Sequence, residues 1–212
     1  MKQTPILFST QMVQAIMELR KTQTRRIIKF KKKITNPVIG WTAFTNEGEF
    51  SVRGIHENGD YGESFFKMPY TKGVILWVRE TFVKNTGELP TDLGFVYKAE
   101  LGESELEYSK ELGVKWKPSI FMPKEAARNF LKITNLKIER IQEISEQDAI
   151  AEGVEVLQKD SAGTLYRDYE GKKLGHTSAI ESFKSLWCSI NGKESWDKNP
   201  FVWVIAFEKT NK

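Results

Sequence analysis

The segment "RNFLKITNLKIERIQEI", residues 128–144, alternates apolar and polar side chains, which is the pattern of a β-strand with one buried face. The alternation runs in one register up to Ile133 and in the other register from Leu136. One extra residue in a strand of an antiparallel pair produces such a shift. The sequence therefore predicts a long strand with a β-bulge near Thr134 and Asn135.

The next segment, "SEQDAIAEG" (145–153), has the signals of a short helix. Ser145 can cap its first turn, Asp148 follows three residues later, and Gly153 can adopt the left-handed conformation that ends a helix. A longer helix is expected over 177–192, because it opens with a Ser-x-x-Glu capping box and closes with Asn-Gly.

Short apolar or β-branched runs predict the remaining strands. They lie in residues 5–10, 24–30, 40–54 (a hairpin turning at 46–48), 73–82, 93–99 and 200–209. A helix from Ser9 or Thr10 to about Arg20 is expected after the first strand, whereas 55–73 are expected to be loop and 155–175 a mobile polar insertion. Because strands outnumber helices and are mostly not joined by helical crossovers, we expect an α+β fold with a curved, largely antiparallel sheet or small barrel.

The composition fits a single domain over residues 1–212, since six Trp and thirteen Phe supply a sizeable core. No run of about eighteen apolar residues is present, and the apolar stretch at the N-terminus is too short for a signal peptide. We therefore expect a cytoplasmic protein with no membrane partner, and a monomer is the default. Cys188 has no partner for a disulfide in the chain and is expected to be a buried small apolar residue.

Several common chemistries lack their motifs in this chain. His56 and His176 have no suitably spaced His, Asp or Glu partners for a metal ion. A Walker loop and a Rossmann glycine fingerprint are both absent from the sequence. We therefore expect neither a metal site nor a cofactor.

Lys21 and Thr24 lie where the first helix gives way to a strand, in "ELRKTQTRR" (18–26). Residues three apart on a regular strand point to opposite faces, so these side chains meet only if the backbone turns between them. A threonine hydroxyl needs a neighbouring base to act as a nucleophile, and lysine is such a base when burial or nearby cations lower its pKa. The alternative is structural, because lysine is favoured at a helix C-terminus and threonine suits a strand.

Glu152 breaks a local rule, because it lies in the last turn of the expected short helix, beside the negative end of the helix dipole. Such a position raises the pKa of a carboxyl group, which is useful in a group that delivers a proton. Local misfits are also where functional residues tend to be found. The alternative interpretation is an exposed glutamate that lowers the stability of the fold only slightly.

Basic residues are concentrated in "RRIIKFKKK" (25–33), although the chain as a whole has a net charge of only +4. Such a cluster can neutralise nucleic-acid phosphates, and it can equally be a solvated loop. Its candidate phosphate contacts are Arg25, Lys29, Lys31, Lys32 and Lys33.

The motif "RKTQTRR" is similar to the K-T-x-T-x-R signature at the first helix of the ASCH domain family, a PUA-like β-barrel group associated with RNA. "ISEQDAIAEG" resembles the family's short helix after the central strand, and "FVWVIAF" resembles its closing strand. "LWVRET", "KPSIFMP" and "LWCSINGKESWDKNPFVWVI" further resemble an uncharacterised branch common in phages and prophages. The resemblance implies a PUA-like small curved β-barrel or mixed sheet flanked by a few helices, with insertions at about 37–72 and 155–176.

Within that family, small amidohydrolases that remove the acetyl group from acetylated cytidine use a lysine, a threonine and a glutamate. Matching their motifs carries these catalytic roles to Lys21, Thr24 and Glu152, with a modified nucleoside or RNA as the implied partner. The chain departs from those enzymes at Leu19, where they have a glycine, and in its insertions, which can reshape the pocket. Candidate substrate-binding residues around such a site are Arg26, Trp77, Trp116 and Arg128, and a place in the core is the favoured alternative for Trp77.

Two functions remain open from the sequence. In the first, neutral Lys21 takes the proton of Thr24, Thr24 attacks the acyl carbonyl, and Glu152 protonates the leaving amine. In the second, the same barrel reads RNA without catalysis, with the basic cluster on phosphates and aromatic side chains on unstacked bases. A role through protein contacts alone has no distinct signal. The hydrolase needs Lys21 and Thr24 as a reacting pair, whereas an RNA-binding module does not.

Overall fold

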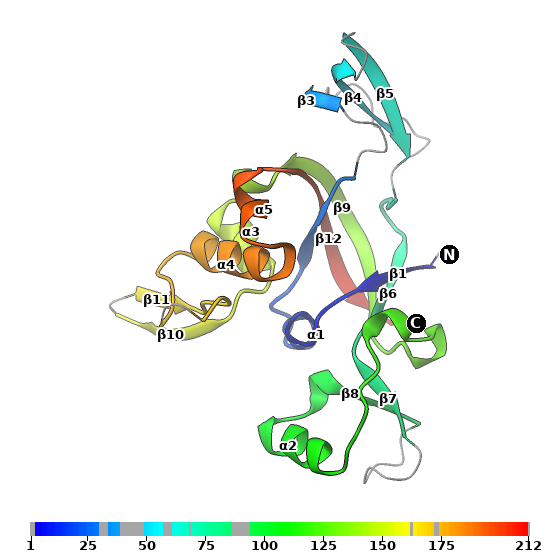
Figure 1. Cartoon of the computed structure of the whole chain (residues 1–212), viewed down its shortest axis with the longest axis vertical. Coiled ribbons are helices and arrows are strands. Elements are labelled where there is room, and N and C mark those ends of the chain that lie inside the picture. The colour runs from blue at the N-terminus through cyan, green and yellow to red at the C-terminus, as the bar shows by residue number, and fades with distance from the viewer. Residues whose placement is uncertain are drawn as a thin grey trace.

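The structure is a computed structural model that describes residues 3–29, 34–38, 49–56, 61–67, 69–85, 94–161, 163–171 and 174–211. Its centre is a five-stranded sheet (Figure 1). In spatial order, the strands of this sheet are β1 (Gln3–Leu7), β6 (Ile75–Arg79), β9 (Phe130–Arg140), β12 (Phe201–Thr210) and β2 (Gln23–Ile27). The pair β1–β6 is parallel, and the other neighbouring pairs of this sheet are antiparallel.

The long strand β9 has the bulge that its sequence predicts. Against β12, Asn135 pairs with Ala206 and Ile133 pairs with Phe207, so Thr134 is the extra residue. The extra residue restores the register, and side chains on both sides of the bulge, such as Ile133 and Ile138, are therefore buried in the same core cluster.

Three helices have the N-terminal caps that the sequence predicts. They are α1 (Thr10–Met17), α3 (Glu146–Ala151) and α4 (Ala179–Asn191), and each follows a serine whose hydroxyl accepts a hydrogen bond from a backbone N–H of the first turn. Helix α1 ends earlier than expected, and Leu19 then has a positive φ of 60° that turns the chain toward β2. The short α5 (Glu194–Asp197) follows α4, and Figure 1 shows α3, α4 and α5 grouped on one side of the sheet.

The remaining elements form three smaller units. An antiparallel sheet consists of β3 (Ile34–Val38), β4 (Glu49–His56) and β5 (Tyr61–Lys67). A hairpin of β7 (Phe82–Lys84) and β8 (Phe95–Tyr97) precedes α2 (Glu103–Glu111), and a second hairpin consists of β10 (Val156–Asp160) and β11 (Gly163–Tyr166). Single turns of 3-10 helix occupy Lys98–Glu100, Ser119–Phe121, Lys124–Ala126 and Ile141–Glu143.

The α+β class is confirmed, but the central sheet does not close into a barrel within the described ranges. Residues 55–73, expected to be loop, contain β5 and the end of β4, so His56 is the last residue of a strand. Residues 155–175, expected to be an irregular insertion, contain the β10–β11 hairpin. These strands are polar or contain glycine, and backbone pairing rather than an apolar pattern defines them. The turn expected at 46–48 lies outside the described residues.

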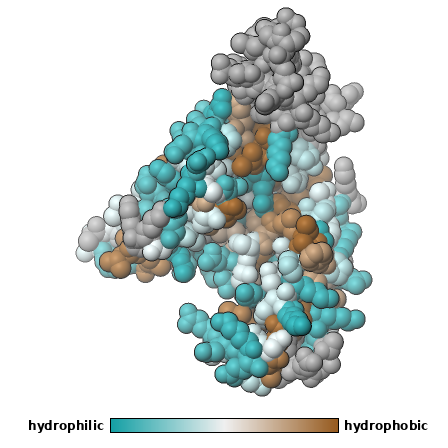
Figure 2. All heavy atoms as spheres, in the orientation of Figure 1, coloured by the Kyte–Doolittle hydropathy of each residue, from teal (hydrophilic) through white to brown (hydrophobic). Residues whose placement is uncertain are grey.

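Buried apolar side chains form two clusters. The larger cluster joins the central sheet to α1 and α4 and includes Cys188, which is buried as expected. The smaller cluster contains Trp77 and lies against the β7–β8 hairpin. Figure 2 shows apolar residues also on the surface in the region of the β10–β11 hairpin, and Val156 and Leu157, the first two residues of β10, are exposed. In the part of the chain that the structure describes, no helix has the length and apolar character needed to cross a bilayer.

Candidate functional site

The connection between α1 and β2 brings Lys21 to the candidate site. The backbone N–H groups of Arg20 and Lys21 both donate to the Ala15 carbonyl, at 2.9 and 3.0 Å, and thereby close α1. Lys21 then forms an isolated antiparallel bridge with Glu152 at the end of α3. The handover from helix to strand is therefore confirmed, and it places Lys21 opposite Glu152.

Lys21 and Glu152 form a buried ion pair. Lys21 Nζ donates to Glu152 Oε2 at 2.9 Å and to the Glu152 carbonyl oxygen at 2.7 Å, and the two side chains are 2% and 3% exposed. Burial lowers the pKa of Lys21 from its ordinary value, and the opposing effect of Glu152 only partly offsets burial. Lys21 therefore loses its proton more readily than a surface lysine does, as a general base requires.

Two cations compensate the unfavourable position of Glu152 at the end of α3. Glu152 is the C-cap residue of that helix, where the dipole disfavours a carboxylate. Its Oε2 accepts a hydrogen bond from Lys21, and its Oε1 accepts one from Arg25 Nη1 at 3.0 Å. The interpretation of Glu152 as an exposed glutamate is therefore wrong, because the residue is 3% exposed.

Gly153 allows α3 to approach Lys21 closely. Its φ is +87°, a backbone conformation that residues with a Cβ rarely adopt. A Cβ at this position would lie 2.8 Å from Lys21 Cβ and 3.0 Å from Ala15 Cβ. The glycine predicted as a helix stop therefore also sets the distance between Glu152 and Lys21.

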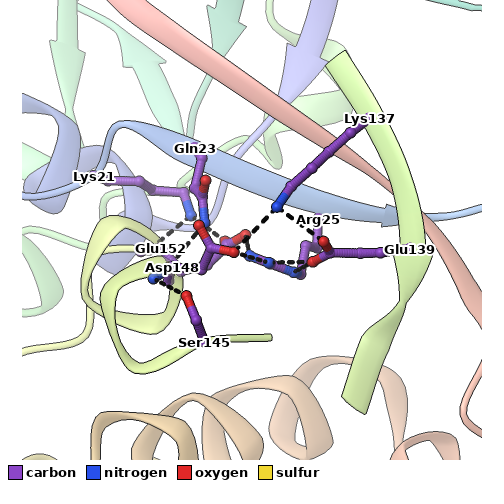
Figure 3. Close-up of polar contacts among 8 residues, drawn as sticks. All are labelled: Lys21, Gln23, Arg25, Lys137, Glu139, Ser145, Asp148 and Glu152. Atoms are coloured by element: carbon purple, nitrogen blue, oxygen red, sulfur yellow. Dashed lines mark hydrogen bonds and ion pairs between the residues drawn. The ribbon is translucent and has the colours of Figure 1, made fainter. Parts of the chain in front are cut away.

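Arg25 is the centre of an ion-pair network that joins β2, β9 and α3 (Figure 3). Its side chain is 0% exposed, and its guanidinium contacts Glu139, Asp148 at 3.1 Å and Glu152 at 3.0 Å. Lys137 Nζ lies 2.9 Å from Glu139 and 3.3 Å from Asp148. Burial acts to raise the pKa of Asp148, but the charges of Arg25 and Lys137 outweigh burial and hold this pKa below its ordinary value. The network fixes the Glu152 carboxylate relative to β2.

A cavity of about 350 Å³ lies beside the Lys21–Glu152 pair. Thr24, which is 4% exposed on β2, lines this cavity together with Lys21 and Glu152. Small-molecule sites commonly have volumes of about 300–1,000 Å³. The structure thus brings the three expected catalytic residues to one cavity of suitable size. Its other lining residues are Leu7, Phe8, Ser9, Met12, Arg25, Arg26, Ile27, Lys29, Phe183, Leu186, Trp187, Ile190 and Asn191.

Lys21 and Thr24 share the cavity without a direct hydrogen bond. In the described chain, the hydrogen bonds of Lys21 Nζ are to the carboxylate and the carbonyl oxygen of Glu152. Lys21 must therefore turn from Glu152 toward the Thr24 hydroxyl to act as its base. Hydrogen bonds of this kind commonly tighten only after substrate has bound.

The four expected substrate-binding residues are separated in the structure. Arg26 lines the cavity, where its Nη2 donates to the Leu7 carbonyl at 2.5 Å. Trp77 is 8% exposed in the smaller core cluster, and Trp116 is partly buried outside the cavity lining. Arg128 forms an ion pair with Glu80 at 2.9 Å, also outside this lining. The aromatic walls are instead supplied by Phe8, Phe183 and Trp187.

The expected phosphate contacts have different environments. Arg25 is buried and held by three carboxylates, so its guanidinium is inaccessible to a nucleic-acid backbone, and the prediction that it contacts phosphate is wrong. Lys29 is exposed and lines the cavity. Lys31, Lys32 and Lys33 lie outside the described residues.

Sequence reasoning missed the network around Arg25 and the wall that α4 contributes. One signal for the network was available, because residues 23 and 25 of a strand point to the same face. Gln23 Nε2 donates to the Asp148 carbonyl at 2.9 Å, and Arg25 contacts the Asp148 carboxylate, so both side chains face α3.

No group of three or more His, Cys, Asp or Glu side chains in the described ranges is arranged to hold a metal ion. His176 Nε2 lies instead 3.2 Å from Asp168 Oδ1. Comparisons of the chain with protein-family models, with curated proteins and with solved structures found no match.

Proposed function

We propose that this chain hydrolyses the amide bond of an acylated nucleobase, with Lys21, Thr24 and Glu152 as its catalytic residues. The observation that carries the proposal is that these three residues, from distant parts of the sequence, line one cavity in which burial lowers the pKa of the lysine. The resemblance of "RKTQTRR" and "ISEQDAIAEG" to motifs of the ASCH domain family supports the same three residues.

The resting ion pair holds both proton-transfer groups of the proposed reaction. Passage of one proton from Lys21 Nζ to Glu152 Oε2, across 2.9 Å, gives a neutral amine and a neutral carboxylic acid. The amine is then the base for Thr24, and the acid is the proton donor for the leaving nitrogen. The exchange removes two buried charges, which offsets part of its cost.

In the first half of the reaction, Thr24 Oγ1 gives its proton to Lys21 and forms a bond to the acyl carbon. The tetrahedral intermediate breaks its C–N bond as Glu152 protonates the amine of the base, and the acyl group remains on Thr24 as an ester. In the second half, Glu152 takes a proton from an attacking water molecule. Lys21 gives its proton to the Thr24 oxygen as the carboxylic acid product leaves, and passage of the Glu152 proton back to Lys21 restores the resting ion pair.

The shape of the cavity favours a small substrate. Its volume of about 350 Å³ suits one nucleoside rather than a folded RNA. Phe8, Phe183 and Trp187 provide apolar surface for a planar base, and the reacting residues lie on the β2 and α3 sides of the same space.

The test is to follow deacylation of acetylated cytidine and a panel of other acylated nucleosides by chromatography. Thr24→Val keeps the shape of the side chain and removes the hydroxyl, and we expect a loss of at least about 100-fold in turnover. Thr22→Val is the matched control, because Thr22 is exposed and does not line the cavity. Lys21→Met and Glu152→Gln should lose activity in the same way.

Each variant is checked for folding by circular dichroism before its activity is measured. Wild-type turnover in a folded Thr24→Val variant would contradict the role of Thr24 as nucleophile. Failure of the wild-type protein to deacylate any member of the panel would contradict the proposed reaction on free nucleosides.

A further inference from the structure

Two buried N–H donors that lack an acceptor belong to residues of the cavity wall. Among the described residues, the buried side-chain nitrogen and oxygen atoms without a hydrogen-bond partner are Gln3 Oε1, Arg26 Nε and Trp187 Nε1. Arg26, on β2, and Trp187, on α4, both line the cavity beside Lys21. Buried polar groups in folded proteins are almost always paired, so each of these two donors calls for an acceptor that the protein does not supply and that a bound ligand can provide.

The cavity also carries positive charge that the protein does not neutralise. Within the described ranges, the hydrogen bond of the Arg26 guanidinium is to the Leu7 carbonyl, and neither Arg26 nor Lys29 forms an ion pair. The carboxylate that lines the cavity belongs to Glu152, which is already held by Lys21 and Arg25. A bound anion would therefore find free cationic partners here.

The order of residues along β2 places this charge relative to the proposed nucleophile. Thr24 and Arg26 are two residues apart on a strand, so they point to the same face about 7 Å apart. Thr24 is 4% exposed, whereas Lys29, beyond the end of β2, is exposed. A ligand with its acyl group at Thr24 therefore has its other end at Arg26 and Lys29, toward solvent.

We propose that Arg26 and Lys29 form a subsite for a phosphate group, so that the ligand is a nucleoside monophosphate rather than a neutral nucleoside. The nucleoside part of this inference rests on the proposed function, whereas the anion is inferred from the unpaired donors. A phosphate monoester offers three strong acceptor oxygens and suits the planar guanidinium of arginine. Trp187 Nε1 supplies a further donor for a neutral acceptor of the same ligand.

The test compares the binding of cytidine and of cytidine 5′-monophosphate by isothermal titration calorimetry at low salt. Neither ligand carries an acyl group, so the result does not depend on hydrolysis. We expect the wild-type protein to bind the monophosphate at least about tenfold more tightly, with the preference falling as salt is added. Arg26→Gln and Lys29→Gln should each reduce the preference, and Lys29 is exposed, so its replacement leaves the fold intact.

The control is Lys110→Gln, which makes the same change of charge at an exposed position on α2 and should keep the preference. Equal affinity for the two ligands, absence of binding by both, or a preference that survives both Arg26→Gln and Lys29→Gln would overturn the phosphate subsite. Tighter binding of a cytidine dinucleotide than of the monophosphate would overturn the mononucleotide and identify an RNA strand as the source of the phosphate. A retained phosphate preference in a protein that deacylates neither an acylated nucleoside nor an acylated nucleoside monophosphate would reject the proposed reaction and leave the subsite standing.

Discussion

Replacement of Arg25 by methionine removes a buried cation that contacts three carboxylates. The Arg25 side chain is 0% exposed, and those of Glu139, Asp148 and Glu152 are 11%, 25% and 3% exposed. Removal of one partner from a buried ion pair costs about 3–5 kcal/mol, because the remaining charges lose their compensation. We expect the free energy of unfolding to fall by about 4 kcal/mol near pH 7. For a chain of this length, that loss lowers the melting temperature by roughly 10 °C.

The loss of unfolding free energy caused by Arg25→Met should become smaller as the pH falls. The pKa of Asp148 is lower in the folded state than its unfolded value of about 3.9. Ionised Asp148 therefore stabilises the fold above about pH 4, and this contribution disappears as the pH falls through the folded pKa. Arg25→Met removes one cause of the shift, so less of this stability remains to be lost in acid. The difference between wild type and variant should narrow below about pH 4.

Urea unfolding at pH 7 and at about pH 3.5, followed by circular dichroism, measures both effects. Arg167→Met is the matched control, because Arg167 and its partner Glu155 are 44% and 40% exposed, and a surface pair contributes at most about 1 kcal/mol. Adding Glu139→Gln to Arg25→Met should recover part of the loss, since Arg25→Met leaves three carboxylates with only Lys21 and Lys137 as cationic partners among the described residues, and the second change removes the excess negative charge. A loss below about 1 kcal/mol for Arg25→Met at pH 7 would refute the reasoning.

Three further predictions concern the surroundings of Lys21. Leu19 has a φ of 60° and is 69% exposed, so its backbone conformation favours glycine. Leu19→Gly should therefore be more stable than Leu19→Ala by roughly 0.5–1 kcal/mol, whereas alanine is usually the more stabilising of the two. A higher melting temperature for the alanine variant would contradict this prediction. Gly153→Ala should lower the free energy of unfolding by more than about 2 kcal/mol and reduce turnover, because the alanine Cβ would lie 2.8 Å from Lys21 Cβ. Wild-type stability together with wild-type turnover would count against the close approach of α3 to Lys21. Burial holds the pKa of Lys21 in the folded state below its value of about 10.4 in the unfolded state. At pH values between the two pKa values the unfolded state binds more protons, so the stability contributed by Lys21 rises with pH in that range. Stability measured from pH 7 to pH 10 should therefore rise less, or fall more, in Lys21→Met than in the wild type, and identical slopes would show that this pKa is not lowered.

Local signals were sufficient where an element carries a strong apolar pattern or a cap. The bulge of β9 and the serine caps of α3 and α4 are examples, because a few neighbouring residues determine each. The residues of β10 are all exposed, and α2 buries only Ser109, so neither element has an apolar pattern to read. Pairing with distant backbone and contacts with the rest of the fold define such elements.

The candidate site also combines features that local sequence predicts with contacts between distant residues that it does not predict. The family resemblance, and not spacing, assigned Lys21 and Glu152 to one site, and their ion pair across 131 residues was not predicted. Arg25 was assigned to a phosphate-binding surface because it lies in a run of basic residues. Its partners Glu139 and Asp148 are 114 and 123 residues away, and the strand alternation shows only that Gln23 and Arg25 share a face, not which distant residues surround Arg25.

The pairing of β2 with β12 has a consequence for protein synthesis. Thr24 lies opposite Ile205, and the ladder partner of β2 in the central sheet is β12. The ribosome delivers residues 23–27 long before residues 201–210, and pairings so distant in sequence form late. A nascent chain released before residue 201 therefore contains every proposed catalytic residue and still lacks the strand that aligns β2, so the pocket is completed only after residues 201–210 have been synthesised.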